Sequence, residues 1–173
     1  FRHYYSACID RWSGPRHELN RRFVHLTLLL DQGEDAQGPR WTPQSRTFQD
    51  LRAVLAAVPD PALVLLGAPG SGKSTLLRHF ELDNARTARA SEDDPTAKPI
   101  TFFVALNGYG PRGADPPPRP LDWLGERWQT QNPNLPPLDA LLQQRRVTLL
   151  LDALNEMPQT GPESLRNWKT FLA

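Results

Sequence analysis

Residues 62–74 read ALVLLGAPGSGKS, a short apolar run that leads directly into a glycine-rich turn. Residues 62–66 are apolar throughout and too few for a helix, which is typical of a strand buried in a parallel sheet. The glycines allow the following backbone to curl tightly and to aim successive N–H groups at one point. A glycine-rich turn ending in Lys73 and Ser74, between a predicted strand and a predicted helix, predicts a loop that cradles phosphate groups.

The phosphate loop also predicts which atoms contact a nucleotide and its metal. The helix that follows adds its unpaired N-terminal amides and the positive end of its dipole. We expect Lys73 to contact the β and γ phosphates, Ser74 to coordinate Mg²⁺ and the Thr75 amide to approach the α phosphate. The alternative is a glycine-proline turn with a chance lysine. The predicted nucleotide-binding residues are Gly67, Ala68, Pro69, Gly70, Ser71, Gly72, Lys73, Ser74 and Thr75.

A second acidic motif follows another apolar run. Asp152 comes directly after residues 147–151, at the predicted carboxyl end of a buried strand, where a carboxylate can hold the water shell of Mg²⁺. If the chain turns there, Glu156 can face the γ phosphate and polarise a water, so Glu156 is the predicted base and Lys73 the other catalytic residue. The alternatives are a strand-end charge at Asp152 and a solvated loop residue at Glu156.

The rest of the chain alternates helix and strand patterns. Thr47 is the expected N-cap of a helix that prolines at positions 59 and 61 stop, and the proline-rich residues 108–120 predict a surface loop. This alternation predicts an α/β fold with a parallel sheet. The predicted strands are residues 23–30, 62–66, 100–106 and 147–151. The predicted helices are residues 4–12, 47–58 and 73–90, one after Pro120, one after Pro137, and residues 162–173.

Composition excludes several classes of partner. The 173 residues suit one domain, and Lys plus Arg (20) nearly balance Asp plus Glu (19), with the signs interspersed. This balance argues against binding to nucleic acid or an anionic membrane, and the apolar runs are too short to span a bilayer. We therefore expect a cytoplasmic protein. The lone Cys8 cannot form a disulfide within the chain, and its neighbours Ile9 and Trp12 predict a buried helical face.

The two motifs together resemble the NACHT family of the STAND class of signalling NTPases. Residues 149–157 read LLLDALNEM, and that family's second motif is an apolar strand, Asp, a small residue, an apolar residue and then Asp-Glu. By this resemblance Asp152 corresponds to the metal-coordinating acid, Ala153 to the small residue and Glu156 to the catalytic glutamate. Asn155 departs from the pattern, because the family has an acid there. The loss of one negative charge bears on hydrolysis rather than on nucleotide binding.

The resemblance runs from about residue 23 to the C-terminus, and residues 80–86 resemble bacterial members. It implies a three-layer P-loop NTPase fold that binds ATP or ADP with Mg²⁺ and hydrolyses ATP slowly. It further implies self-association controlled by the nucleotide, in signal transduction such as bacterial defence. On this basis residues 1–60 are the expected helix, strand and helix lead-in, and residues 61–173 the NTPase core.

We also expect the chain to be a piece of a longer polypeptide. It begins at Phe1, and Met157 is its single methionine. In the family, the strand after the second motif inserts between the two strands that carry the motifs. The sheet is therefore expected to be incomplete at its C-terminal end.

Two other functions stay open from the sequence. A small-molecule kinase would place a phosphoryl acceptor beside the phosphate loop, but a glutamate after a strand-end aspartate favours attack by water. A module that binds nucleotide without hydrolysing it is compatible with Asn155. The choice of ATP over GTP rests on the resemblance alone.

Overall fold

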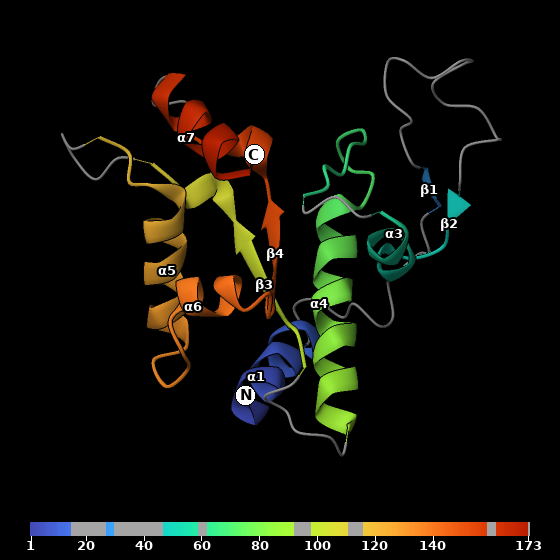
Figure 1. The fold of residues 1–173 in the computed structure, drawn as a ribbon. Helices are drawn as coiled ribbons and strands as arrows, with labels where there is room; N and C mark the ends of the chain where they lie inside the picture. Colours follow the sequence, from blue (N-terminus) through green and yellow to red (C-terminus); the bar gives the residue numbers. More distant parts are fainter. Residues whose placement is uncertain are drawn as a thin grey trace.

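The computed structural model describes residues 1–14, 27–29, 47–58, 62–91, 98–110, 116–158 and 162–172 (Figure 1). Its helices are α1 Arg2–Ser13, α3 Leu51–Ala57, α4 Lys73–Ala90, α5 Pro120–Gln131, α6 Leu138–Gln143 and α7 Pro162–Leu172. Its strands are β1 Leu28–Leu29, β2 Thr47–Phe48, β3 Ile100–Ala105 and β4 Val147–Asp152. Two short 3₁₀ turns, η1 Leu106–Gly108 and η2 Leu154–Glu156, follow β3 and β4.

Strands β3 and β4 form the central parallel pair, with Ile100 opposite Val147 and Ala105 opposite Asp152. Their carboxyl ends therefore meet at one edge, as parallel pairing requires. Figure 1 shows the pair between α4 on one side and α5 and α6 on the other. This arrangement confirms the predicted α/β class and the strands predicted at residues 100–106 and 147–151. The three-layer fold, the incomplete sheet and the division at residue 60 stay predictions.

The strand predicted at residues 62–66 is wrong for this structure. Residues 62–68 belong to no helix or strand, and Val64 and Leu66 are 75% and 69% exposed. An extended segment becomes a strand only when a neighbour completes its hydrogen-bond ladder. Among the described residues, the sheets contain only the pairs β1–β2 and β3–β4. No strand there is hydrogen-bonded to residues 62–66. The apolar sequence of these residues predicted a buried strand, whereas the segment lies outside both sheets and most of it is exposed.

The region before the phosphate loop also differs from the prediction. Of the strand predicted at residues 23–30, only 27–29 lie among the described residues, where β1 pairs antiparallel with β2. Thr47 lies in β2 and does not cap the next helix. Asp50 is the N-cap of α3, and its Oδ1 accepts a hydrogen bond of 2.7 Å from the Ala53 amide. Both residues are good caps, and the β1–β2 pairing assigns Thr47 to a strand.

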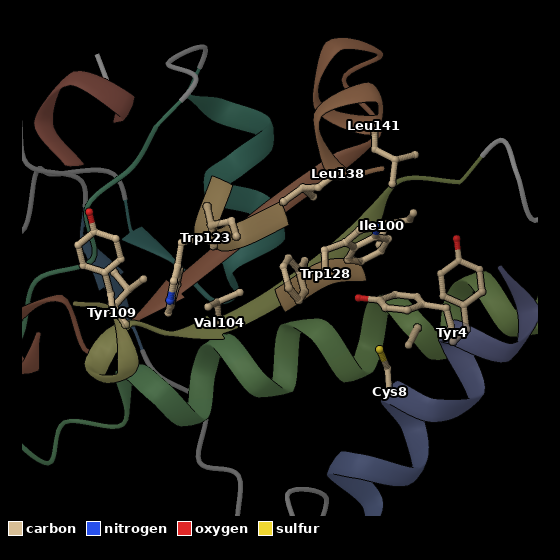
Figure 2. Close-up of a cluster of buried hydrophobic side chains, with 14 of the residues drawn as sticks. Tyr4, Cys8, Ile100, Val104, Tyr109, Trp123, Trp128, Leu138 and Leu141 are labelled. Carbon is tan, nitrogen blue, oxygen red and sulfur yellow. The ribbon is translucent and has the colours of Figure 1, made fainter. Parts of the chain in front are cut away.

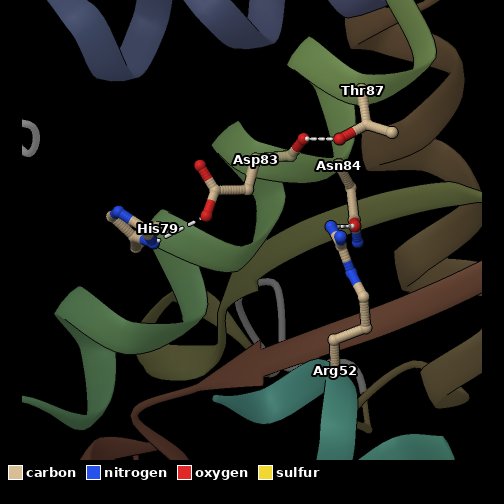
Figure 3. Close-up of polar contacts among 5 residues, drawn as sticks. All are labelled: Arg52, His79, Asp83, Asn84 and Thr87. Carbon is tan, nitrogen blue, oxygen red and sulfur yellow. Dashed lines mark hydrogen bonds and ion pairs between the residues drawn. The ribbon is translucent and has the colours of Figure 1, made fainter. Parts of the chain in front are cut away.

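Helix α3 is joined to α4 by a polar contact (Figure 3). Nη2 of Arg52 donates a 2.6 Å hydrogen bond to Oδ1 of Asn84. On the same helix as Asn84, His79 and Asp83 form an i, i+4 pair with Nδ1 and Oδ2 3.0 Å apart. The contact fixes the helix that precedes the phosphate loop against the helix that follows it.

The main hydrophobic core lies between the sheet and α1, α4, α5, α6 and α7. Figure 2 shows the part of it contributed by α1, α5 and α6. Successive β3 residues point to opposite faces of the sheet. The Phe102 ring lies 5.1 Å from Trp128 of α5, and the Phe103 ring lies 5.4 Å from Trp12 of α1. The predicted helix at residues 4–12 is confirmed, and so is the burial of Cys8 and Trp12. Burial raises the pKa of the Cys8 thiol to about 12.

Two side chains form hydrogen bonds with backbone groups on the outer edge of β3, the edge that faces away from β4. The Ile100 amide donates to the Arg146 carbonyl on the β4 side, so residues 101 and 103 present their backbone groups to the other side. There the Tyr4 hydroxyl donates to the Thr101 carbonyl, and Oε1 of Glu81 accepts a 2.9 Å hydrogen bond from the Phe103 amide. Helices α1 and α4 thus each cover one hydrogen-bonding group of the β3 edge.

Glu81 is a fully buried carboxyl that the sequence did not predict. Its second oxygen accepts a 2.6 Å hydrogen bond from Nε1 of Trp12, so it links α4 to both α1 and β3. Burial raises the pKa of this carboxyl above the usual glutamate range, while the hydrogen bonds from Trp12 and Phe103 act in the opposite direction.

One end of the proline-rich loop packs into the hydrophobic core. Residues 111–115 lie outside the described residues, and residues 116–119 have no regular structure, as predicted. Tyr109, however, is fully buried, and its hydroxyl donates a 2.6 Å hydrogen bond to the Pro118 carbonyl. Its ring packs edge-on against Trp123 and Trp168, so one end of the loop anchors α5 and α7.

Candidate functional site

The phosphate loop lies at the start of α4, as the sequence predicted. Gly70 and Gly72 have φ angles of +76° and +89°, in the left-handed region that residues with a Cβ avoid. Gly72 is the N-cap of α4, and the Leu76 amide donates a 2.8 Å hydrogen bond to the Gly72 carbonyl. The first three amides of the helix, Lys73 to Thr75, precede this first intrahelical bond. A bound anion can accept hydrogen bonds from these three amides.

The Lys73 ammonium lies over the loop. Nζ donates to the carbonyl oxygens of Gly67 at 2.7 Å and Ala68 at 2.9 Å, and lies 3.4 Å from Oγ of Ser71. A Cβ on Gly67 would lie 2.8 Å from the same Ser71 oxygen, so this close packing requires glycine or a shift of that side chain. The lysine charge is therefore held inside the curve of the loop, where phosphate oxygens can replace the carbonyls as its acceptors.

The structure brings the two predicted metal-binding side chains together. Oγ of Ser74 donates a 2.8 Å hydrogen bond to Oδ1 of Asp152, which connects the start of α4 to the end of β4. The side chain of Asp152 is only 12% exposed, whereas residues 67–71 are exposed. A partly buried carboxylate beside a hydroxyl, next to an open loop, is a set of oxygen donors that suits Mg²⁺.

Glu156 lies just beyond this pair, in the turn η2. Ala153 takes the left-handed conformation, with φ +60° and ψ +38°, and reverses the chain so that the Glu156 amide donates to its carbonyl at 3.0 Å. Met157 is buried and anchors the end of the turn. The turn after Asp152 is as predicted. Glu156 and Asn155 are exposed, and the side chain of Glu156 makes no hydrogen bond or ion pair with the described part of the chain.

Arg78 is a neighbour of the site that the sequence analysis missed. It follows Ser74 by one helical turn, and its Nη2 lies 4.0 Å from Oδ2 of Asp152. Its guanidinium carbon lies 5.4 Å from the ring centres of both Trp12 and Phe103. The four-residue spacing from Ser74 places it on the same face of the helix, which is the signal that could have revealed it.

Other kinds of site find no support in the described residues. They contain no group of three or more His, Cys, Asp or Glu side chains that could hold a metal ion. They also contain no helix whose length and apolar character would let it cross a membrane.

Comparison with known proteins agrees with this geometry. The family model for the NACHT domain matches residues 61–171, which is well over half of the chain and includes the phosphate loop, β3, β4 and η2. No match was found among curated proteins. The search of solved structures likewise gave no match.

Proposed function

Because this chain belongs to the NACHT family, whose domain is a nucleotide-binding NTPase module, we propose that it binds ATP with Mg²⁺ and hydrolyses it slowly. The observation that supports the proposal most strongly is the 2.8 Å hydrogen bond between Ser74 and Asp152 beside the open phosphate loop. Two distant segments of the chain converge there on one place for a metal ion.

Each residue has a distinct role in this proposal. The amides at the start of α4 and the ammonium of Lys73 bind the phosphates, and Ser74 and Asp152 hold the Mg²⁺ ion and its water. Bound Mg²⁺ neutralises charge that develops on the phosphate oxygens. Glu156 acts as the base that orients an attacking water. Its exposed position on η2, four residues after Asp152, leaves the carboxylate accessible to solvent, as this role requires.

Variants of the full-length protein separate binding from hydrolysis. We expect Lys73→Ala to lose nucleotide binding measured by calorimetry, and Glu156→Gln to keep binding while phosphate release falls about 10²- to 10⁴-fold. Asn155→Asp is the matched control, since it changes one charge in the same turn and leaves Glu156 in place. Phosphate release without any added acceptor distinguishes hydrolysis from kinase activity.

Three outcomes would revise the proposal. No ATP binding by the wild-type protein would reject it entirely. Turnover that persists in Glu156→Gln would reject the assigned base. Tight binding with no phosphate release from either the wild type or Asn155→Asp would favour the alternative of a binding module without hydrolysis, for which the neutral Asn155 is the supporting observation.

The wider role in a signalling switch is part of the same proposal. A STAND switch uses contacts to the γ phosphate to select between a closed monomer and an assembled state. We expect the full-length protein to change its mass in light scattering between ADP and a non-hydrolysable ATP analogue. An identical mass with both nucleotides, under conditions where both bind, would contradict this part.

A further inference from the structure

Arg78 of α4 contacts both Trp12 of helix α1 and Asp152, the proposed metal-binding carboxylate. The guanidinium lies 5.4 Å from the ring centres of Trp12 and Phe103, which meet edge to face at an interplanar angle of 82°. Its Nε is buried and has no hydrogen-bond partner in the described parts of the chain. Contacts with the two rings, rather than hydrogen bonds, therefore determine where the charge of Arg78 lies.

The position of this charge matters for Asp152. At 4.0 Å, Nη2 is too far from Oδ2 for a hydrogen bond but close enough to attract the carboxylate. The other oxygen of Asp152 is engaged by Ser74. An arginine free to approach would form a direct ion pair with the carboxylate and compete with a metal ion for its oxygens.

The rings that hold Arg78 back are themselves fixed. Nε1 of Trp12 donates to Glu81, and Glu81 accepts from the Phe103 amide, so one buried carboxyl connects both ring-bearing residues. Docking of α1 therefore determines whether the Trp12 ring is present beside Arg78.

From these contacts we infer that Arg78 is a positioning residue that couples metal-dependent nucleotide binding at Asp152 to the docking of helix α1. The inference rests on the proposed function. While α1 is docked, Trp12 and Phe103 keep Arg78 away from direct contact with Asp152, and Mg²⁺ binds well. When α1 is displaced, Arg78 closes on the carboxylate and Mg²⁺ binds more weakly. By reciprocity, binding of Mg²⁺ with nucleotide stabilises the docked helix by the same factor.

The first test measures nucleotide binding by calorimetry at a series of Mg²⁺ concentrations and in EDTA. We expect Trp12→Leu to raise the half-saturating Mg²⁺ concentration about three- to tenfold, as one nearby charge in a water-like medium predicts, and to leave binding in EDTA unchanged. Trp12→Phe is the matched control. It also loses the hydrogen bond to Glu81 but keeps a ring beside Arg78, so its Mg²⁺ dependence should match the wild type.

The second test uses Arg78→Met, at a position whose side chain is 32% exposed. We expect a half-saturating Mg²⁺ concentration below that of the wild type, and no further effect when Trp12→Leu is added. In hydrogen exchange, Mg²⁺ with nucleotide should slow exchange in α1 several-fold more than nucleotide in EDTA does. Helix α5 serves as the internal reference. The additional slowing of exchange in α1, measured relative to α5, should vanish in Arg78→Met.

The failures are distinguishable. If the wild-type protein binds no nucleotide, the proposed function fails and the coupling with it. If it binds nucleotide with Mg²⁺ but Arg78→Met has the wild-type Mg²⁺ dependence and the wild-type response in α1, the proposed function stands and the coupling is wrong. Equal shifts in Trp12→Leu and Trp12→Phe would likewise overturn the coupling, because loss of the Glu81 hydrogen bond would explain both.

Discussion

Oγ of Ser74 and Oδ1 of Asp152 lie 2.8 Å apart, although 78 positions separate the two residues in the sequence. One belongs to the first turn of α4 and the other to the last position of β4. Their hydrogen bond brings the phosphate loop and the acidic motif together. The bond involves the same oxygens that Mg²⁺ would use in the proposed function, so binding of Mg²⁺ there would exchange one interaction for another.

Ser74→Ala should therefore affect metal binding more than folding. We expect the variant to lose about 1 kcal/mol of folding stability, a typical value for one hydrogen bond. Its affinity for nucleotide in the presence of Mg²⁺ should fall about tenfold or more, and its affinity in EDTA should stay near that of the wild type. Calorimetry with and without Mg²⁺ measures both values. An equal loss in the two conditions would mean that Ser74 contacts the phosphates rather than the metal.

The phosphate loop offers a test of backbone conformation alone. A Cβ added at Gly70 or at Gly125 would meet nothing within 4 Å, but Gly70 has a φ of +76° and Gly125 lies in helix α5. Gly70→Ala should cost roughly 1 kcal/mol of stability and weaken nucleotide binding, because alanine disfavours positive φ.

Gly125→Ala is the control for Gly70→Ala. The same chemical change in a helix interior should stabilise the protein by up to about 1 kcal/mol. Urea unfolding of both variants gives the comparison. Similar effects at the two positions would show that the loop does not hold Gly70 in the left-handed region.

The buried Glu81 predicts a dependence of stability on pH. Its pKa is raised in the folded state, so between the usual glutamate pKa and the raised value the folded protein binds more protons than the unfolded chain. Folding stability from this group should be greatest below the usual glutamate pKa and should fall as pH rises through the raised value.

Glu81→Gln isolates this contribution, because glutamine does not titrate. We expect the unfolding free energy of the wild type to fall relative to that of Glu81→Gln as pH rises from about 4 through the raised pKa of Glu81. Urea unfolding at several pH values provides the measurement. A difference that is constant with pH would contradict the raised pKa.

Two buried tryptophans differ in one hydrogen bond. Trp128 and Trp168 are 0% and 2% exposed; Nε1 of Trp128 donates to the Pro136 carbonyl at 2.9 Å, whereas Nε1 of Trp168 is buried with no partner in the described ranges. Substitution by phenylalanine removes the same atoms from each. We expect Trp128→Phe to cost about 1 kcal/mol more than Trp168→Phe, because only the first leaves an acceptor without its donor. Thermal unfolding of the pair tests this difference, and equal costs would indicate that Trp168 has found a partner.

The sequence predicted the parts of the fold whose signals are local. Glycines and an apolar helix face identify the phosphate loop and α4, and apolar runs of strand length identify β3 and β4. The glycine-rich pattern pointed to Lys73 and Ser74, and the end of an apolar run pointed to Asp152. The structure brings Ser74 and Asp152 together, and the roles of the three residues stay predictions.

The features that the sequence missed depend on contacts between distant segments. Glu81 looks like a solvated helix residue until Trp12 and Phe103 supply donors for its carboxylate. Arg78 is an ordinary basic residue of a helix until two rings and Asp152 surround it. Residues 62–66 have the composition of a buried strand, but a strand also needs a partner, which composition does not supply.

The partly covered edge of β3 discourages growth of the small sheet on that side. An unpaired edge is a template for other chains, and here Tyr4 of α1 and Glu81 of α4 each occupy one of its hydrogen-bonding groups. A shortened version of the protein that lacks α1 would lose the Tyr4 contact and keep that of Glu81. It should therefore pair with other chains along this edge and aggregate more readily than the intact protein, even though its nucleotide motifs are intact.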